Sequence, residues 1–301
     1  DLISADDRGQ TAGLEFFARQ VVEGFCGGIH RSPHKGISVE FKQHRQYVSG
    51  DEIRHLDWRV FGKTDRFYIR EYEEETNLRA TLLLDTSGSM GYEGTSFPPR
   101  QSLTKLQYAQ RLAACFAYLM LGQQDSVGIA TFDDRLREIV PHRATPNHLQ
   151  TLTAVMQRCR AGGDGNIGEI LGSVTPKIGR RGLVVIISDC FADLDSLRDG
   201  LARLKHRRHE VIIFQIWDRD ELEFPFNQWT RFDCLEVDGV RQMLDPAHAR
   251  AEYMKNLENF RDDLQRVCNR TRIDLVPMVT DEPYAKALAS DLVSRMRKRR
   301  R

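Results

Sequence analysis

Residues 80–90 read Ala-Thr-Leu-Leu-Leu-Asp-Thr-Ser-Gly-Ser-Met, an apolar run that stops at Asp85 and continues into hydroxyl side chains. The apolar part is typical of a strand that is buried on both faces of a parallel sheet. Asp85 then lies at the carboxyl end of that strand, where open parallel sheets place their ligand crevices. The Asp85 carboxylate and the hydroxyls of Ser87 and Ser89 are hard oxygen donors, which suit Mg²⁺, Mn²⁺ or Ca²⁺. The stretch therefore predicts a parallel sheet with a candidate cation site at its edge.

From residue 78 onward, short apolar runs alternate with longer segments of helical periodicity. This alternation predicts an α/β fold with a doubly wound, mostly parallel six-stranded sheet of the Rossmann-like kind and one antiparallel edge strand. The expected strands are residues 78–84, 126–132, 136–140, 183–188, 211–217 and 273–279. The expected helices are residues 103–120, 149–156, 167–174, 194–204, 253–267 and 284–296. The Asp238-Gly239 pair, which lies between alternating apolar positions, predicts an appended β-hairpin.

Residues 1–77 do not follow this alternation, and we expect them to form an N-terminal extension packed on a main domain of residues 78–301. The extension contains a dense polar and aromatic stretch from residue 40 to residue 75. A segment so rich in aromatic side chains and isoleucine has enough apolar surface to fold, so we do not expect it to be disordered.

Composition and charge narrow the class of partner. Lys and Arg number 44 against 43 Asp and Glu, so the overall charge gives no reason to expect nucleic acid. No apolar run approaches the roughly 20 residues that a membrane-spanning helix needs. The start of the chain also lacks the layout of a signal peptide. We therefore expect a cytoplasmic protein with no membrane span.

Two further segments are expected to bring donors to the edge where Asp85 lies. Residues 184–188 form a second buried strand that ends at Asp189, which places another carboxylate at the carboxyl edge. The glycine-rich turn at residues 162–165 precedes a helix and contains Asp164, whose carboxylate can approach the same point. The candidate metal ligands are therefore Asp85, Ser87, Ser89, Asp164 and Asp189.

The order of these motifs resembles the metal-ion-dependent adhesion site of the von Willebrand factor A domain. The resemblance rests on Asp85-Thr-Ser-Gly-Ser89, a long helix, a strand, a Gly-Gly loop before a helix, and a strand that ends at Asp189. It implies a divalent ion surrounded by the aspartate and two serines of the first loop, a threonine of the second and an aspartate of the third. It also implies one open coordination position that a partner's carboxylate fills, so that the metal joins proteins and does not catalyse.

The second loop departs from the pattern of that family. Gly165 stands where the family has threonine, which removes one hydroxyl ligand, and Asp164 is the candidate replacement. A carboxylate would bind a hard cation more strongly than a hydroxyl does. Two interpretations stay open, an occupied Mg²⁺ or Mn²⁺ site and a vestigial site without metal.

A second resemblance covers nearly the whole chain. Residues 36–41, 45–59 and 71–75 resemble the bacterial family named as domain of unknown function 58, whose members carry this stretch before an adhesion-type domain. The resemblance implies joint action with a MoxR-type AAA ATPase in a chaperone-like or assembly role. Matched charges in this stretch are expected to clamp the extension to the sheet or, alternatively, to face a partner. These charged residues are Glu40, Arg45, Asp51, Arg54, Asp57, Arg59, Arg70 and Glu73.

We therefore expect a non-enzymatic module that binds a protein partner, either a MoxR-type ATPase or a protein that presents a carboxylate. One alternative is a metal-free scaffold that binds through the charged N-terminal extension. A less favoured alternative is a metal-dependent hydrolase, since no activated nucleophile can be named. Cys190 has no histidine placed by sequence to activate it, and Ser87 stands where an aspartyl-phosphate phosphatase has its second aspartate. The sequence leaves the partner, the cation and the oligomeric state open.

Overall fold

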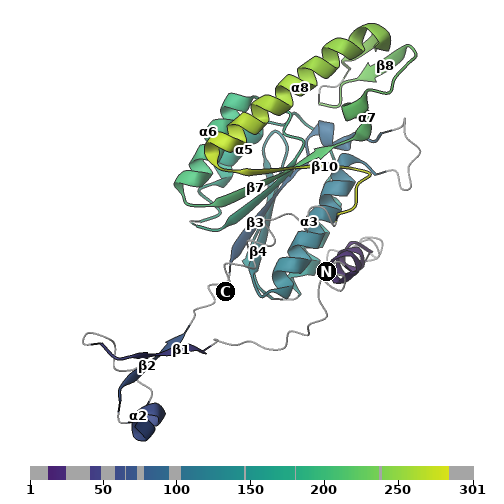
Figure 1. Cartoon of the computed structure of the whole chain (residues 1–301). Coiled ribbons are helices and arrows are strands. Elements are labelled where there is room, and N and C mark those ends of the chain that lie inside the picture. The colour runs from purple at the N-terminus through teal and green to yellow at the C-terminus, as the bar shows by residue number, and fades with distance from the viewer. Residues whose placement is uncertain are drawn as a thin grey trace.

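A six-stranded sheet with the strand order β10-β7-β6-β3-β4-β5 lies at the centre of the computed structural model (Figure 1). The structure describes residues 13–24, 41–48, 58–64, 66–72, 78–94, 103–145, 147–179, 181–236 and 239–284. The strands of the sheet are β3 (Arg79–Asp85), β4 (Ser126–Phe132), β5 (Leu136–Arg143), β6 (Leu183–Ser188), β7 (Glu210–Trp217) and β10 (Asp274–Val279). Neighbouring strands run parallel, except that β5 pairs antiparallel with β4 at one edge. The predicted doubly wound, mostly parallel sheet is confirmed.

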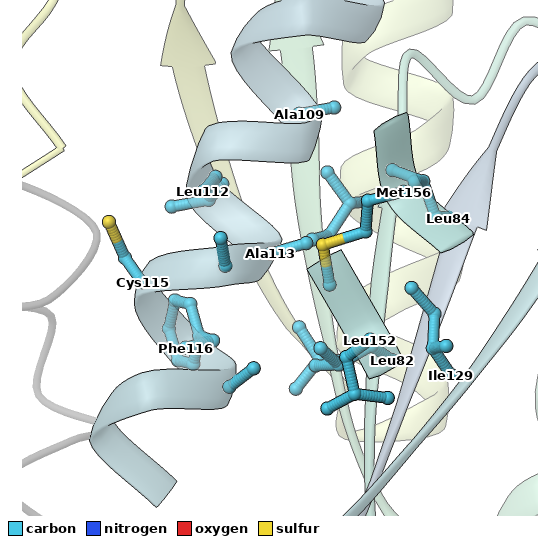
Figure 2. Packing of buried hydrophobic residues seen from close by; sticks show 14 of the residues in the cluster. Leu82, Leu84, Ala109, Leu112, Ala113, Cys115, Phe116, Ile129, Leu152 and Met156 are labelled. Carbon is cyan, nitrogen blue, oxygen red and sulfur yellow. The ribbon is translucent and has the colours of Figure 1, made fainter. Parts of the chain in front are cut away.

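The side chains of β3 alternate between two apolar layers. Leu82 and Leu84 pack in the layer that contains helices α3 (Lys105–Gly122) and α4 (His148–Arg158), as Figure 2 shows. Leu83 packs in the opposite layer, which contains residues of helices α5 (Ile167–Val174), α6 (Leu194–His206) and α8 (Pro246–Thr271). Because both faces of the sheet are covered, its central strands require continuous apolar runs, which explains the sequence pattern at residues 80–84.

The five expected helices that fall within the described residues are present, and one of them differs clearly in length. Helix α8 begins at Pro246, ahead of the expected residue 253, and ends at Thr271. Proline is favoured at the first helical position, because its fixed φ suits the helix and its missing N–H is not needed there. The expected helix 284–296 lies, apart from Tyr284, outside the described residues.

The appended hairpin is present, but its strands end earlier than the sequence suggested. Strands β8 (Thr230–Asp233) and β9 (Arg241–Leu244) pair antiparallel and follow the short helix α7 (Arg219–Glu223). The last bridge beyond them is a hydrogen bond from the Cys234 amide to the Val240 carbonyl, at 2.9 Å. Residues 235–236 lie outside the two strands, and the Leu235 carbonyl lies against Gly88 of another loop. The expected turn residue Asp238 lies outside the described residues.

Part of the N-terminal segment packs on the main sheet domain. Residues 13–24 form a helix whose apolar residues Leu14, Ala18 and Val22 belong to the same buried layer as α3. Separately, β1 (Phe41–Gln46) and β2 (Tyr68–Tyr72) form an antiparallel pair with helix α2 (Trp58–Thr64), and Figure 1 shows this unit apart from the six-stranded sheet. The charged side chains expected to clamp the extension lie outside the described part of the chain. The boundary at residue 78 stays a prediction.

Candidate binding site at the carboxyl edge of the sheet

Four adjacent parallel strands end at or next to a buried aspartate. Asp85 ends β3, and Asp133, Asp189 and Asp218 follow β4, β6 and β7. Each is at most 5% exposed. The strand order places them side by side along one edge of the sheet. Because a buried carboxylate is costly unless it is hydrogen-bonded or paired, its partners decide what each aspartate can do.

The first loop after β3 gathers the donors that the sequence predicted there. The amide of Ser87 donates to Asp85 Oδ1 at 2.9 Å, which bends the chain sharply at the strand end. The hydroxyl oxygens of Ser87 and Ser89 lie 3.2 Å apart. A short 3₁₀ turn, η2 (Gly88–Gly91), continues the loop and holds this pair in place.

The other oxygen of Asp85 is held by a neighbouring strand. The hydroxyl of Ser188, the last residue of β6, donates to Asp85 Oδ2 at 2.5 Å. Burial, together with the charge of Asp189, raises the pKa of Asp85 to about 7. The hydrogen bonds from Ser188 and Ser87 oppose this shift but do not cancel it. Asp85 thus has two neutral donors and carries a charge only near or above neutral pH.

A strained turn follows β6 and presents Asp189. The next residue, Cys190, takes a φ of 62°, which is uncommon for a residue with a side chain. Its amide donates to Ser188 Oγ at 2.8 Å, and the Phe191 amide donates to Asp189 Oδ1 at 3.2 Å. Cys190 itself is buried, and burial raises the pKa of its thiol well above the ordinary value. The thiol is therefore a poor nucleophile.

A buried lysine that the sequence reasoning missed lies beside Asp189. Lys105 Nζ is 2.8 Å from Asp189 Oδ2 and 2.6 Å from Glu221 Oε1, and the lysine side chain is 0% exposed. A capping box between Thr104 and Gln107 begins α3 and fixes Lys105 at its first helical position. Burial alone lowers the pKa of Lys105, but the charges of Asp189 and Glu221 outweigh it and raise the pKa.

A signal for this lysine existed in the sequence. Lys105 precedes Ala109 by four residues and Leu112 by seven, so it belongs to the apolar face of its helix. A charge on such a face needs a buried partner. Glu221 gave no comparable signal, because it lies on the short helix α7, whose position depends on the tertiary fold.

The glycine-rich second loop packs directly on the first. The Gly88 amide donates to the Gly163 carbonyl at 2.9 Å. A Cβ at Gly165 would lie 2.9 Å from the Ser87 Cβ, closer than real Cβ atoms approach. Gly165 thus touches Ser87, at the place where the adhesion-type pattern has threonine. The predicted ligand Asp164 is exposed.

The hairpin connection brings one more carboxylate to this edge. A Cβ at Gly88 would lie 2.0 Å from the Leu235 carbonyl oxygen, so the two backbones are in close contact. Glu236, the next residue, has its pKa raised by burial and by the charges of Asp164 and Asp189. A hydrogen bond from the Ser89 side chain opposes this shift. Sequence reasoning missed Glu236, since nothing local to it indicates contact with the first loop.

The assembled groups fit a divalent cation in their chemistry. The Ser87 and Ser89 hydroxyls form a close pair in the loop after Asp85, Asp189 follows the adjacent strand β6, and these carboxylates outnumber the Lys105 ammonium. Hard oxygen donors of this kind suit Mg²⁺ or Mn²⁺. Within the described residues, no group of three or more His, Cys, Asp or Glu side chains could hold a metal ion. A metal here would therefore depend on the two hydroxyls.

The chain is similar to two uncharacterized mycobacterial proteins along most of its length. One is from Mycobacterium bovis and one from Mycobacterium tuberculosis, and each is 26% identical over 288 residues. The match covers 94% of this chain and 88% of the relative in both cases. Within the described residues, no helix combines the length and the apolar character that a membrane crossing requires.

Solved structures show weaker likenesses. A conserved hypothetical protein, BatB, from Bacteroides thetaiotaomicron gives a TM-score of 0.45 at 14% identity, covering 74% of this chain and 100% of that one. The SpRpn10 VWA domain gives 0.41 at 13% identity, covering 71% and 94%. The pilus adhesin SpaC from Lactobacillus rhamnosus GG gives 0.46 at 10% identity, covering 75% and 31%. Because these TM-scores are low, we take the fold from the strand order and not from these likenesses.

The family comparison agrees with the resemblance seen in the sequence. The matching family model spans residues 43–263, so it takes in most of the β1–β2 unit, the strand-end aspartates and the hairpin. This chain therefore belongs to the family described as "Protein of unknown function DUF58".

Proposed function

We propose that this protein is a non-enzymatic interaction module that binds a protein partner at the carboxyl edge of its six-stranded sheet. The observation that carries the proposal is the pair of hydroxyls, Ser87 and Ser89, held 3.2 Å apart in the loop after Asp85, at the edge where the adjacent strand β6 leads into the buried Asp189. The four groups come from two loops that rigid strands position, as a preorganised binding site requires.

In the leading form of this proposal, Ser87 and Ser89 bind Mg²⁺ or Mn²⁺ directly. Asp85 and Asp189 hold the ion directly or through water, and Asp164 adds charge from the second loop. Bound there, the metal supplies a positive charge that attracts a carboxylate of the partner. The residues of this chain fix the ion and its orientation, while the partner provides the remaining ligand.

A second form needs no metal, and the Lys105–Asp189 pair supports it. The ammonium already neutralises one carboxylate at 2.8 Å, so the site has a cation of its own. Binding would then use the shape and hydrogen bonds of the edge or the charged N-terminal extension, and chelators would leave a complex intact.

The metal-dependent form is tested by titrating Mn²⁺ into the purified chain in a calorimeter. We expect saturable binding in the millimolar range or tighter, and a loss of about tenfold or more in affinity when Ser87 and Ser89 are both changed to Ala, about 1.4 kcal/mol. Ser173→Ala is the matched control, because this hydroxyl bonds only to a helix carbonyl, that of Ile170. Absence of Mn²⁺ binding by the wild type at millimolar concentration would reject this form.

For the partner, we propose a MoxR-type AAA ATPase from the same organism. The test is a pull-down of the purified ATPase by this chain, with Mg²⁺ and with chelator. Retention that disappears with chelator and in Asp85→Ala supports the metal-dependent form. If the ATPase is retained in the presence of chelator and also by Asp85→Ala, the result supports the metal-free scaffold. If the ATPase is not retained at all, this partner is rejected.

A further inference from the structure

We propose that His142 is a pH-sensitive latch, which holds the last residues of the edge strand β5, 140–143, to the sheet and releases them when its imidazole is protonated. The latch lies near the amino-terminal ends of β3 and β4, at the opposite end of these strands from the carboxyl edge. The proposal therefore does not depend on the proposed function. It adds a local opening of the fold in acid.

A bulge in β5 turns His142 over the neighbouring strand. The register of β5 against β4 shifts at Gly128, so that this one residue lies opposite both Pro141 and His142. Bulges of this kind re-aim side chains, and they accommodate a proline, which cannot donate to the ladder. A Cβ at Gly128 would lie only 3.2 Å from the His142 ring. The absence of a side chain at Gly128 therefore leaves the space in which the imidazole crosses β4.

The imidazole reaches β3, which is not the direct neighbour of β5. His142 Nε2 lies 2.8 Å from Thr81 Oγ1, and His142 Nδ1 lies 3.4 Å from an Arg79 guanidinium nitrogen. A guanidinium can only donate, so Nδ1 accepts this bond and carries no proton. The proton of the neutral ring is then on Nε2, which donates to the Thr81 hydroxyl. The ring makes both bonds only in its neutral form.

The groups around His142 oppose its protonation. Burial and the charge of Arg79 on β3 lower the pKa of His142 to about 4, and His148 of α4 and His209 before β7 act in the same direction. Among the described groups that act on its charge, none is a carboxylate. His148 and His209 are buried, and burial lowers their pKa as well. A proton on His142 would therefore break the bond from Arg79 and place a second positive charge beside the guanidinium.

Loss of this bridge would act on a weak part of the sheet. In the described sheet β5 is an edge strand that pairs with β4 alone, and the bulge already interrupts this pairing. Release of residues 140–143 would turn this part of β4 into an exposed edge, whose N–H and C=O groups can pair with another strand.

The direction of the pH effect follows from the lowered pKa. The folded chain binds this proton less readily than the unfolded chain, in which the pKa of histidine is 6.5. The contribution of the latch to stability is therefore fully present above pH 6.5 and is lost as the pH falls to about 4.

The proposal is tested by hydrogen exchange on the full chain at about pH 7 and about pH 4.5, with rates corrected for the intrinsic effect of pH. We expect the amides of residues 140, 142 and 143 to open about tenfold or more often at the lower pH, relative to the amides of β10 at the other edge. His142→Gln keeps a donor and an acceptor but cannot be protonated, so its β5 opening should not respond to pH. His206→Gln, which changes an exposed histidine of α6, is the matched control and should respond like the wild type. Unchanged β5 opening in the wild type, or an equal response in His142→Gln, would overturn the latch.

A second measurement needs no substitution at position 142. In a histidine NMR titration, we expect the His142 ring to have a midpoint well below 6.5. Arg79→Met should raise this midpoint by about half a pH unit or more, because it removes the charge and the hydrogen bond of the guanidinium. A wild-type midpoint at or above 6.5, or the same midpoint in Arg79→Met, would show that the guanidinium does not hold the ring neutral and would overturn the proposal.

Discussion

Two neighbouring strand ends, those of β3 and β6, each present a buried aspartate, but they neutralise it in different ways. Asp85 accepts hydrogen bonds from the Ser188 hydroxyl and the Ser87 amide, at 2.5 and 2.9 Å, and both donors are neutral. Asp189 accepts from the Phe191 amide and from the Lys105 ammonium, at 3.2 and 2.8 Å. The site thus has a fixed cation on the β6 side, whereas the hydrogen-bond partners of the β3 carboxylate within the described residues are all neutral.

This difference indicates which of the two aspartates can gain a proton or bind a cation. On the β6 side, burial and the ion pair fix the charges, so that half is structural. On the β3 side, the charge of Asp85 can be compensated by a proton, as its pKa of about 7 indicates, or by a bound cation. The pair of serine hydroxyls lies on that responsive side.

The largest effect is expected from removing the fixed cation. Lys105→Met would leave Asp189 and Glu221 buried without their ammonium, and breaking a buried pair in this way costs about 3–5 kcal/mol. Denaturant unfolding should show this loss in the free energy of unfolding. Lys255→Met, an exposed lysine of α8, should change it by less than about 0.5 kcal/mol. A similarly small change in Lys105→Met would mean that the pair does not stabilise the fold.

The neutral partners of Asp85 predict a dependence of stability on pH. Burial raises the pKa of this group from 3.8 to about 7 in the folded state, so the folded chain binds the proton more tightly than the unfolded chain. Its stabilising contribution is fully present below pH 3.8 and is lost as the pH rises through about 7. The slope is at most about 1.4 kcal/mol per pH unit.

Asp85→Asn removes this titration. Unfolding measured from pH 4 to pH 8 in chelator should give a flatter profile for the variant than for the wild type, with the difference concentrated between the unfolded and folded pKa values. Asp262→Asn, an exposed carboxylate on α8, should leave the wild-type slope in place. Parallel profiles for Asp85→Asn and wild type would show that Asp85 is ionised throughout.

Gly165→Thr tests whether the hydroxyl missing on the β3 side can be supplied. A threonine hydroxyl at position 165 would add an oxygen ligand, which by itself suggests a gain in Mn²⁺ affinity. However, a Cβ at this position would lie 2.9 Å from the Ser87 Cβ. We therefore expect no gain and a loss of about 1–3 kcal/mol in the free energy of unfolding, as overpacking produces. Gly162→Thr, in the same loop but with nothing within 4 Å of the added Cβ, is the control. Tighter Mn²⁺ binding by Gly165→Thr would contradict the expected clash.

The fold was predictable because its signals are local. The run at residues 80–84 is apolar at nearly every position, and the structure buries it between two helical layers. Asp85 and Asp189 followed from the rule that parallel strands share a carboxyl edge. These inferences need only the order of elements along the chain.

The rest of the site depends on contacts between distant segments. Lys105 reaches Glu221 across 116 residues, and Gly88 touches Leu235 through a hairpin whose position no local pattern specifies. The Asp238-Gly239 pair predicted the hairpin but not the contact of Leu235 with Gly88, because no local pattern indicates that contact. The sequence therefore indicated the donors and not the groups that neutralise or cover them.

The smallest effect we predict concerns the ring beside the fixed cation. Lys105 Nζ lies 5.2 Å from the centre of the Phe191 ring, which is 36% exposed and also contacts Trp217 and Phe260. Phe191→Leu should cost about 1–2 kcal/mol, since a partly exposed cation–π contact contributes about 0.5–1 kcal/mol and the lost aromatic contacts add a similar amount. If the ring acts through the lysine, the loss shrinks when Lys105 is already Met, which a double-mutant cycle of unfolding free energies measures. An additive cycle would mean that Phe191 only packs against its aromatic neighbours, and that Asp189 and Glu221 alone hold the ammonium on the β6 side.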